Sequence, residues 1–167
     1  MEQNKRILSV LVKNHAGVLA RVALLFCQRG FNIDSLTVSE TDDPGISRIT
    51  VTTTGSETLI QQVISQTEKL TETVRVFELK PSTSVMRELL LVKVAANEGE
   101  RGAVKEIAEI YKAKIVDLSP DSMILELTGK PDKIDGMIDM LGSYRIIEMC
   151  RTGVTALGRG IAEEQTF

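Results

Sequence analysis

The sequence predicts an α+β protein built from two ferredoxin-like βαββαβ modules, at residues 1–80 and 85–167. Three observations lead to this fold class. Short runs rich in β-branched residues alternate with segments in which apolar residues recur at helical spacing. The order strand, helix, strand, strand, helix, strand occurs twice, as a repeat of architecture and not of residues. Between the two passes, residues 80–84 are polar and contain a proline, which is typical of a linker.

The first module starts with an apolar run that is too short for a helix, followed by a glycine-containing loop and a helical pattern that ends at Gly30. Strict alternation at residues 46–53 predicts a strand with one solvated face. The parity of apolar residues changes between Ile33 and Leu36, which predicts a bulge near Asp34. The six elements of this module are predicted at residues 7–12, 18–29, 31–39, 46–53, 56–70 and 73–79.

The second module repeats this order with different residues. Pro131 suits the first turn of its second helix, and a Ser-Pro-Asp-Ser turn joins its two middle strands. The tail from Gly153 to Phe167 has no clear period. The elements of this module are predicted at residues 89–94, 101–112, 114–118, 123–128, 131–141 and 144–150.

Composition and charge narrow the function classes. The formal net charge is −3 without a basic stripe, and aromatic residues make up 4%, so nucleic-acid binding is disfavoured. No segment approaches about 20 consecutive apolar residues, and the charged N-terminus leads directly into a strand. We therefore expect a cytoplasmic protein without a membrane span. Cys27 and Cys150 have no metal-type spacing and are expected to be reduced, packed thiols.

Residues that could carry catalysis are few. His15 is the only histidine, so a cluster of histidines around a metal is excluded, and a general base there would lack a nearby nucleophile. A lone histidine beside a glycine turn is more often a loop residue. The acidic pairs, such as Asp42 with Asp43, are adjacent or on solvated helix faces, and no glycine pair has the spacing of a phosphate-binding loop. We therefore expect no enzyme and no metal site.

A binding site is a better interpretation of the loop after the first strand. Gly17 leaves the backbone open at a helix N-terminus, where unpaired N–H groups and the helix dipole favour a carboxylate. Asn14 and Asn32 supply amides that donate and accept, as a zwitterion requires, and apolar neighbours leave room for an aliphatic side chain. The alternative is that Asn14 and Gly17 only build a tight turn. The candidate effector-binding residues are Asn14, His15, Ala16, Gly17, Val18, Leu19, Asn32 and Ile33.

Several stretches resemble a known family. The patterns N-x-x-G-V-L and R-G-F-N-I-D-S-L-T-V resemble the ACT domain, a βαββαβ regulatory module that binds amino acids. The segments R-I-L-S-V-L and T-D-D-P-G-I-S-R-I-T are similar to the regulatory small subunit of acetohydroxyacid synthase, also called acetolactate synthase. In the second half, R-E-L-L-L-V-K-V, K-I-V-D-L and R-T-G-V-T-A-L-G-R-G agree with the same family. The resemblance thus covers nearly the whole chain.

This resemblance implies a regulatory role without catalysis. Such a subunit activates a catalytic large subunit and confers feedback inhibition by valine in branched-chain amino-acid biosynthesis. Thiamine diphosphate, FAD and Mg are then expected only on the large subunit, and no cofactor on this chain. The effector would lie between two ACT domains of a homodimer, with Asn32 reaching the ligand held by the other chain's loop. Asn97 and Gly102 do not reproduce N-x-x-G, so the second module is expected to serve dimerisation or large-subunit contact.

Two other function classes stay open. A free-standing amino-acid-sensing ACT module could control another enzyme or transcription, although no basic DNA-reading helix is visible. A small ferredoxin-like enzyme acting on its sheet face would require turnover without a partner. The sequence does not rank valine, leucine and isoleucine as effectors, and it does not fix the stoichiometry with a catalytic subunit.

Overall fold

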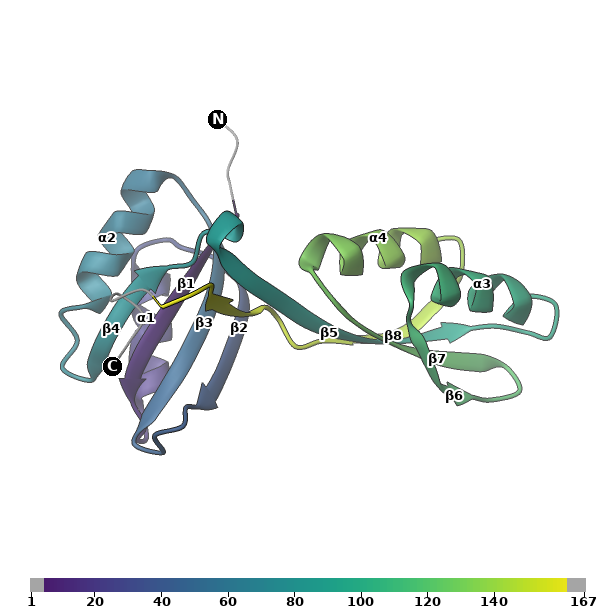
Figure 1. The fold of residues 1–167 in the computed structure, drawn as a ribbon, viewed down its shortest axis with the longest axis horizontal. Coiled ribbons are helices and arrows are strands. Elements are labelled where there is room, and N and C mark those ends of the chain that lie inside the picture. Colours follow the sequence, from purple (N-terminus) through teal and green to yellow (C-terminus); the bar gives the residue numbers. More distant parts are fainter. Residues whose placement is uncertain (1–4, 162–167) are drawn as a thin grey trace. The chain divides into compact units, whose positions relative to one another are not determined.

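The computed structural model describes residues 5–161 (Figure 1). The described chain forms two units, one comprising residues 5–85 together with residues 154–161, and the other Met86–Gly153. The elements are β1 (Lys5–Lys13), α1 (Val18–Gln28), β2 (Ile33–Glu40), β3 (Ile46–Thr54), α2 (Glu57–Thr67), β4 (Thr73–Glu78), the 3₁₀ turn η1 (Pro81–Thr83), β5 (Ser84–Ala95), α3 (Arg101–Tyr111), β6 (Lys114–Leu118), β7 (Ser122–Gly129), α4 (Pro131–Leu141), β8 (Ile146–Arg151) and β9 (Thr155–Gly158).

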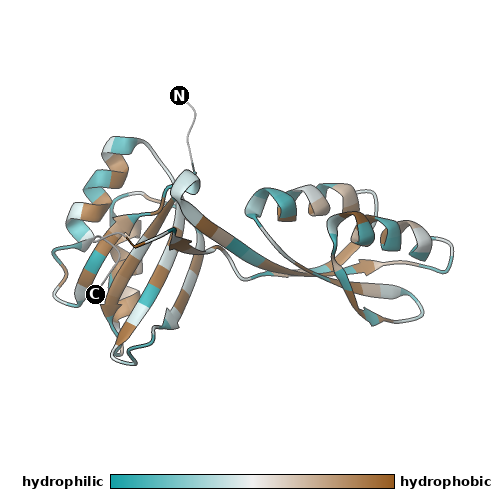
Figure 2. Ribbon diagram, in the orientation of Figure 1, coloured by the Kyte–Doolittle hydropathy of each residue, from teal (hydrophilic) through white to brown (hydrophobic). Residues whose placement is uncertain are grey.

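The first unit is an antiparallel sheet with strand order β2-β3-β1-β4 and with α1 and α2 packed on one face. Alternate residues of β1, namely Leu8, Val10 and Val12, point into the helix-covered core, where they meet Val22 and Phe26 of α1. The apolar residues of these strands stand out as bands in Figure 2. This strand order is that of a ferredoxin-like fold, so the predicted fold class is confirmed.

The second unit has the equivalent order β6-β7-β5-β8. Its core residues Leu90, Val92 and Val94 of β5 pack with α3 and α4, represented by Val104 and Ile134. β5 is longer than the predicted strand at 89–94, because η1 leads directly into it from Ser84. The second βαββαβ module is therefore also confirmed. No helix in the described part of the chain is long and apolar enough to cross a lipid bilayer.

Local signals in the first module behave as the sequence predicted. The register of β2 against β3 shifts between Ile33 and Ser35, which is the predicted bulge. Gly30 follows α1 with a φ of 73°, and the N–H of Phe31 bonds back to the carbonyl of Phe26. The Ser56 hydroxyl accepts a hydrogen bond from the N–H of Leu59 at 3.4 Å and caps α2.

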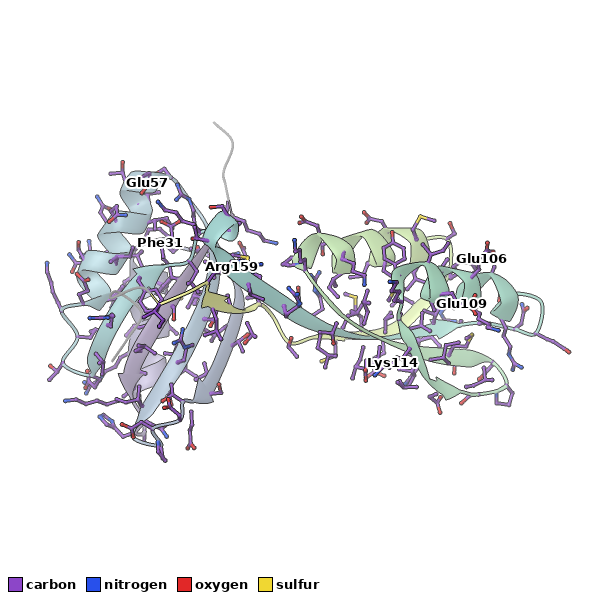
Figure 3. The ribbon with its side chains drawn as sticks, viewed as in Figure 1. Phe31, Glu57, Glu106, Glu109, Lys114 and Arg159 are labelled. Carbon is purple, nitrogen blue, oxygen red and sulfur yellow. The ribbon has the colours of Figure 1, made fainter. Side chains whose placement is uncertain are left out.

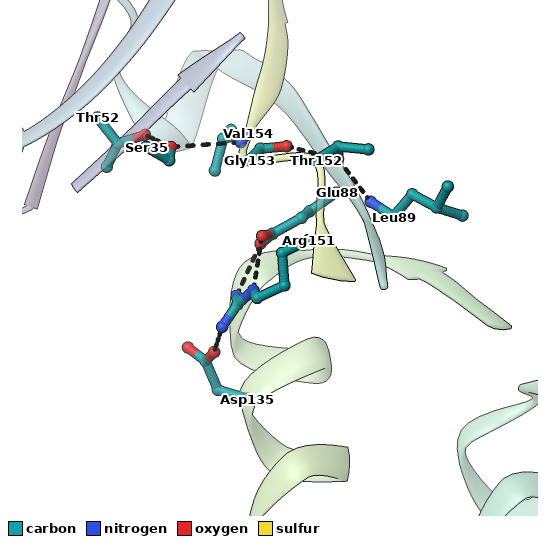
Figure 4. Close-up of polar contacts among 9 residues, drawn as sticks. All are labelled: Ser35, Thr52, Glu88, Leu89, Asp135, Arg151, Thr152, Gly153 and Val154. Atoms are coloured by element: carbon teal, nitrogen blue, oxygen red, sulfur yellow. Dashed lines mark hydrogen bonds and ion pairs between the residues drawn. The ribbon is translucent and has the colours of Figure 1, made fainter. Parts of the chain in front are cut away.

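One face of β3 does not match the sequence prediction. The strand was expected to be solvated on the side of Thr50 and Thr52, yet both are only 2% exposed. Residues from Val154 onward belong to the first unit, and the N–H of Val154 donates to the Ser35 hydroxyl, which in turn donates to Thr52 (Figure 4). The prediction of a half-solvated strand is wrong, because the returning C-terminal segment lies on this side of the strand. That segment is too far away in sequence for the local pattern to reveal it.

The returning segment also changes the expected domain boundary. Residues 153–167 show no sequence period, but Thr155–Gly158 forms β9, which pairs with β5. The N–H of Arg159 donates to the carbonyl of Thr83 at 2.7 Å. The part of the chain from Val154 to residue 161 thus lies with the first unit and not with the second. The roles assigned to the two modules stay predictions.

The two cysteines differ from expectation as well. Cys27 on α1 and Cys150 on β8 are both exposed within this chain, so they are not packed thiols. Cys150 lines a groove of about 210 Å³ on the helix-free face of the second sheet, together with Leu91 and Ile124. The helical period correctly placed Cys27 on a helix but did not tell which face was covered.

Each unit is tied together by an ion triad. In the first, Arg6 of β1 donates to Glu78 of β4 at 2.7 Å and to Glu57 at 2.5 Å, at the start of α2 (Figure 3). These hydrogen bonds, chiefly that to Glu78, raise the pKa of Arg6, and the Arg6 contact lowers the pKa of Glu57.

In the second unit, Arg151 of β8 donates to both carboxylate oxygens of Glu88 of β5, at 2.7 and 2.8 Å, and to Asp135 of α4 at 2.8 Å (Figure 4). The bidentate contact with Glu88 is the main cause that raises the pKa of Arg151. Each triad joins the first strand, the last strand and the second helix of its module.

Candidate effector site

The loop between β1 and α1 positions the first group of candidate residues. It contains Asn14, His15, Ala16 and Gly17, all exposed, and α1 begins at Val18. Gly17 has φ 88° and ψ −13°, a left-handed backbone conformation that residues other than glycine and asparagine rarely adopt. A Cβ built at Gly17 would meet no atom within 4 Å. Glycine is therefore needed for the turn, and the surface above it is open.

The N-terminus of α1 has free hydrogen-bond donors. Within residues 5–161, no side chain caps this helix. The N–H of Val18 reaches the carbonyl of His15 at 3.4 Å, and regular helical bonding begins with Arg21, which donates to Gly17. The N–H groups of Leu19 and Ala20 belong to the first turn and have no intrahelical acceptor. They can bind an anionic group, and the helix dipole favours it.

The Asn14 side chain is held by the turn between β2 and β3. Its Nδ2 donates to the Glu40 carboxylate at 3.0 Å and to the carbonyl of Pro44 at 2.9 Å. The backbone N–H of Asn14 donates to the carbonyl of Gly45 at 2.8 Å. The sequence did not reveal these contacts, because 26 to 30 residues separate the partners.

Val18 and Leu19 play different parts in the loop. The Val18 side chain is buried in the core, so it offers only its backbone to a ligand, whereas Leu19 is 41% exposed. His15 is exposed, with Nδ1 3.5 Å from the carbonyl of its neighbour Ala16. Among the described residues, no group of three or more His, Cys, Asp or Glu side chains could hold a metal ion.

Asn32 and Ile33 lie at the other end of the same sheet. Lys13, just before the loop, is opposite Ile46 of β3, whereas Ile33 is opposite Thr53, seven positions further along. At about 3.3 Å per residue, the two ends are about 23 Å apart. Asn32 is exposed there and donates to Asp34 at 2.9 Å, while Ile33 is half-buried. A single chain does not bring Asn32 to the loop.

The tandem of two ferredoxin-like modules with an open glycine turn at the first helix defines the class of ACT-type regulatory proteins. Residues 8–75 match the family model described as the AHAS small subunit-like ACT domain, and residues 87–160 match the model for the small subunit of acetolactate synthase. The chain belongs to the acetolactate synthase small-subunit family.

Full-length relatives agree with this assignment. The chain is 48% identical to the probable acetolactate synthase small subunit of Archaeoglobus fulgidus, over 93% of this chain and 98% of that protein. It is 44% identical to the acetolactate synthase isozyme 3 small subunit of Salmonella typhimurium, over 93% and 96%. The crystal structure of the small subunit from Thermotoga maritima is similar at a TM-score of 0.87 and 37% identity, covering 95% of this chain and 99% of that one.

Proposed function

We propose that this chain activates the catalytic large subunit of an acetolactate synthase and confers feedback inhibition by valine on it. The observation that carries the proposal is the uncapped N-terminus of α1 behind a left-handed glycine, next to an oriented asparagine, in a member of the small-subunit family. The chain itself would have no catalytic activity. Thiamine diphosphate, FAD and Mg would belong to the large subunit.

The loop offers partners for each part of valine. The N–H groups of Leu19 and Ala20 at the helix N-terminus would bind the carboxylate. The amide of Asn14 would bind the other polar end, and the exposed Leu19 side chain would contact the isopropyl group. One methylene changes affinity by about 10- to 200-fold at most, so leucine and isoleucine are expected as weaker or competing effectors.

A homodimer would complete the site with Asn32. β2 is an edge strand whose outer side has no partner strand among the described residues of this chain. Antiparallel pairing of β2 with a second β2 about a twofold axis would place the start of one strand beside the end of the other. Asn32 of one copy would then approach Glu40 and Asn14 of the other. The 23 Å separation within one chain fits a site shared between two copies.

Inhibition would follow from linkage between the two binding events. If valine favours one arrangement of the dimer and the large subunit favours another, a coupling free energy of about 1–3 kcal/mol is sufficient for strong feedback. By the same linkage, the large subunit must weaken valine binding by the factor by which valine weakens its activation.

The test is the variant Gly17→Asp in holoenzyme reconstituted with the large subunit. A carboxylate at this position would repel the effector's own carboxylate, so we expect valine inhibition to be lost while activation persists. Gly160→Asp is the matched control, because Gly160 has φ 70° and equally open surroundings but is not among the candidate effector residues. Equal valine inhibition of the Gly17→Asp holoenzyme and the unmodified one would refute the site.

The alternative of a free-standing sensor is separated by the same reconstitution. A chain that binds valine but neither activates a large subunit nor alters its response to valine would favour a regulator of another protein. Acetolactate formation by the chain alone would favour an enzyme instead.

A further inference from the structure

The orientation of the Asn14 amide is fixed by its neighbours. An asparagine side chain has one end that donates two hydrogen bonds and one end that only accepts. The Glu40 carboxylate and the Pro44 carbonyl can only accept, and they lie 3.0 and 2.9 Å from the same Asn14 atom. That atom must be the nitrogen, and both its N–H groups are used. The Asn14 oxygen Oδ1 is the end left for a ligand.

This orientation assigns the two ends of an amino-acid effector. Oδ1 accepts and cannot donate, so it suits an ammonium group and would repel a carboxylate. The carboxylate is left to the N–H groups of Leu19 and Ala20. An effector bound here would therefore have its ammonium toward Asn14 and its carboxylate toward the first turn of α1.

Glu40 is the residue that enforces this arrangement. It is the last residue of β2, and the turn that follows it is stiffened by side-chain contacts: Thr41 donates to the carbonyl of Asp43, and the Asp43 carboxylate accepts the N–H of Gly45 at 2.8 Å. Among the described residues, no lysine, arginine or histidine forms an ion pair with Glu40. Its carboxylate is thus engaged with the Asn14 amide and not with a cation of the chain.

We propose that Glu40 is a positioning residue of the effector site, which holds the Asn14 amide with Oδ1 outward so that Asn14 binds the ammonium group of the amino acid. This proposal rests on the proposed function. It predicts that Glu40 acts mainly through Asn14, so that its effect on affinity disappears when Asn14 is removed.

The experiment is calorimetric titration of the full chain with valine, in a double-mutant cycle of Glu40→Ala, Asn14→Ala and the double variant. We expect Glu40→Ala to weaken valine about tenfold, the effect of one lost hydrogen bond to a charged group. Glu40→Gln should stay within about threefold of the unmodified chain, because the glutamine oxygen can accept the same bond. Adding Glu40→Ala to Asn14→Ala should change little. Glu106→Ala, at an exposed glutamate of α3 in the other unit, controls for net charge.

A second measurement follows the Asn14 carboxamide itself by NMR. The N–H proton that it donates to Glu40 should exchange with water faster in Glu40→Ala than in the unmodified chain, whereas the one donated to the Pro44 carbonyl keeps its acceptor. Unchanged valine affinity of Glu40→Ala, or effects of the two substitutions that multiply in the double variant, would overturn the role of Glu40 alone. Absence of valine binding by the unmodified chain would overturn both this assignment and the proposed function.

Discussion

The two modules share a strand order but differ in the loop after their first strand. In the second module, Asn97 accepts hydrogen bonds from the N–H groups of Gly99 and Glu100, at 2.9 and 3.1 Å, and Glu100 accepts the N–H of Asn97 at 3.0 Å. These reciprocal contacts build the turn that precedes α3, a helix that itself has no side-chain cap. In the first module, Asn14 points to another part of the chain and the donors behind Gly17 stay open. The asparagine of the second loop is therefore used within its own turn, whereas that of the first loop is oriented by residues 26 to 30 positions further along the chain.

The two ion triads also differ, both in the strand that carries the cation and in the burial of the acidic side chain. Both triads occupy the same place in their sheets. Glu78 lies opposite the residue two positions after Arg6, and Arg151 lies opposite the residue two positions after Glu88. The cation is on the first strand in the first module and on the last strand in the second. The Glu88 side chain is 4% exposed and that of Glu78 is 13% exposed. The second module therefore depends more on its triad.

The largest expected effect comes from breaking these triads. Arg151→Ala leaves the Glu88 carboxylate buried without its bidentate partner and should lower the free energy of unfolding of the second unit by about 3 kcal/mol. Arg6→Ala should lower that of the first unit by about 1.5 kcal/mol, because Glu78 is less buried. Hydrogen exchange of core amides in each unit measures both. Equal losses would mean that burial of the acid does not set the cost.

A smaller effect separates the two asparagines. Asn97→Ala removes the side-chain hydrogen bonds of the turn before α3 and should lower stability by about 1 kcal/mol while valine binding is retained. Asn14→Ala should instead weaken valine binding, to an affinity that titration can still measure. Urea unfolding and valine titration of both variants give the comparison. If Asn97→Ala also weakened valine binding, the second module would take part in the effector site.

The smallest effect is the pH dependence of the exposed arm of the first triad. Hydrogen bonding from Arg6 lowers the pKa of Glu57 below its ordinary value of 4.5. The contact therefore stabilises the folded chain above pH 4.5, and its contribution is lost as the pH falls through the lowered pKa. Glu57→Gln should slightly reduce the dependence of the free energy of unfolding on pH in this acid range, as measured by unfolding followed by circular dichroism. The control Glu68→Gln should leave that dependence unchanged. A steeper acid dependence in Glu57→Gln would contradict this assignment.

Every helix and strand that sequence periodicity predicted is present in the structure, because each depends on residues that are close along the chain. The bulge near Asp34 was predictable from a change of parity between Ile33 and Leu36, which the register shift confirms. The glycine turn at the start of α1 was also readable, since a left-handed position strongly favours glycine.

Contacts between distant residues were not predictable in this way. The burial of Thr50 and Thr52 depends on a segment about a hundred residues further along, which has no period of its own. The orientation of Asn14 depends on Glu40 and Pro44, and no local pattern ties these residues to the loop. Those contacts occupy the N–H groups of Asn14 and leave its Oδ1, which can only accept a hydrogen bond, for a ligand.

The reversed polarity of the triads has a consequence for how a chain with two similar sheets avoids misassembly. If the last strand of one module were to pair with the first strand of the other, Glu78 would face Glu88, or Arg151 would face Arg6. Like charges at such paired positions are destabilising, and exchange between tandem modules is a common failure in folding. The opposite polarity of the two triads thus disfavours pairing of the last strand of one module with the first strand of the other.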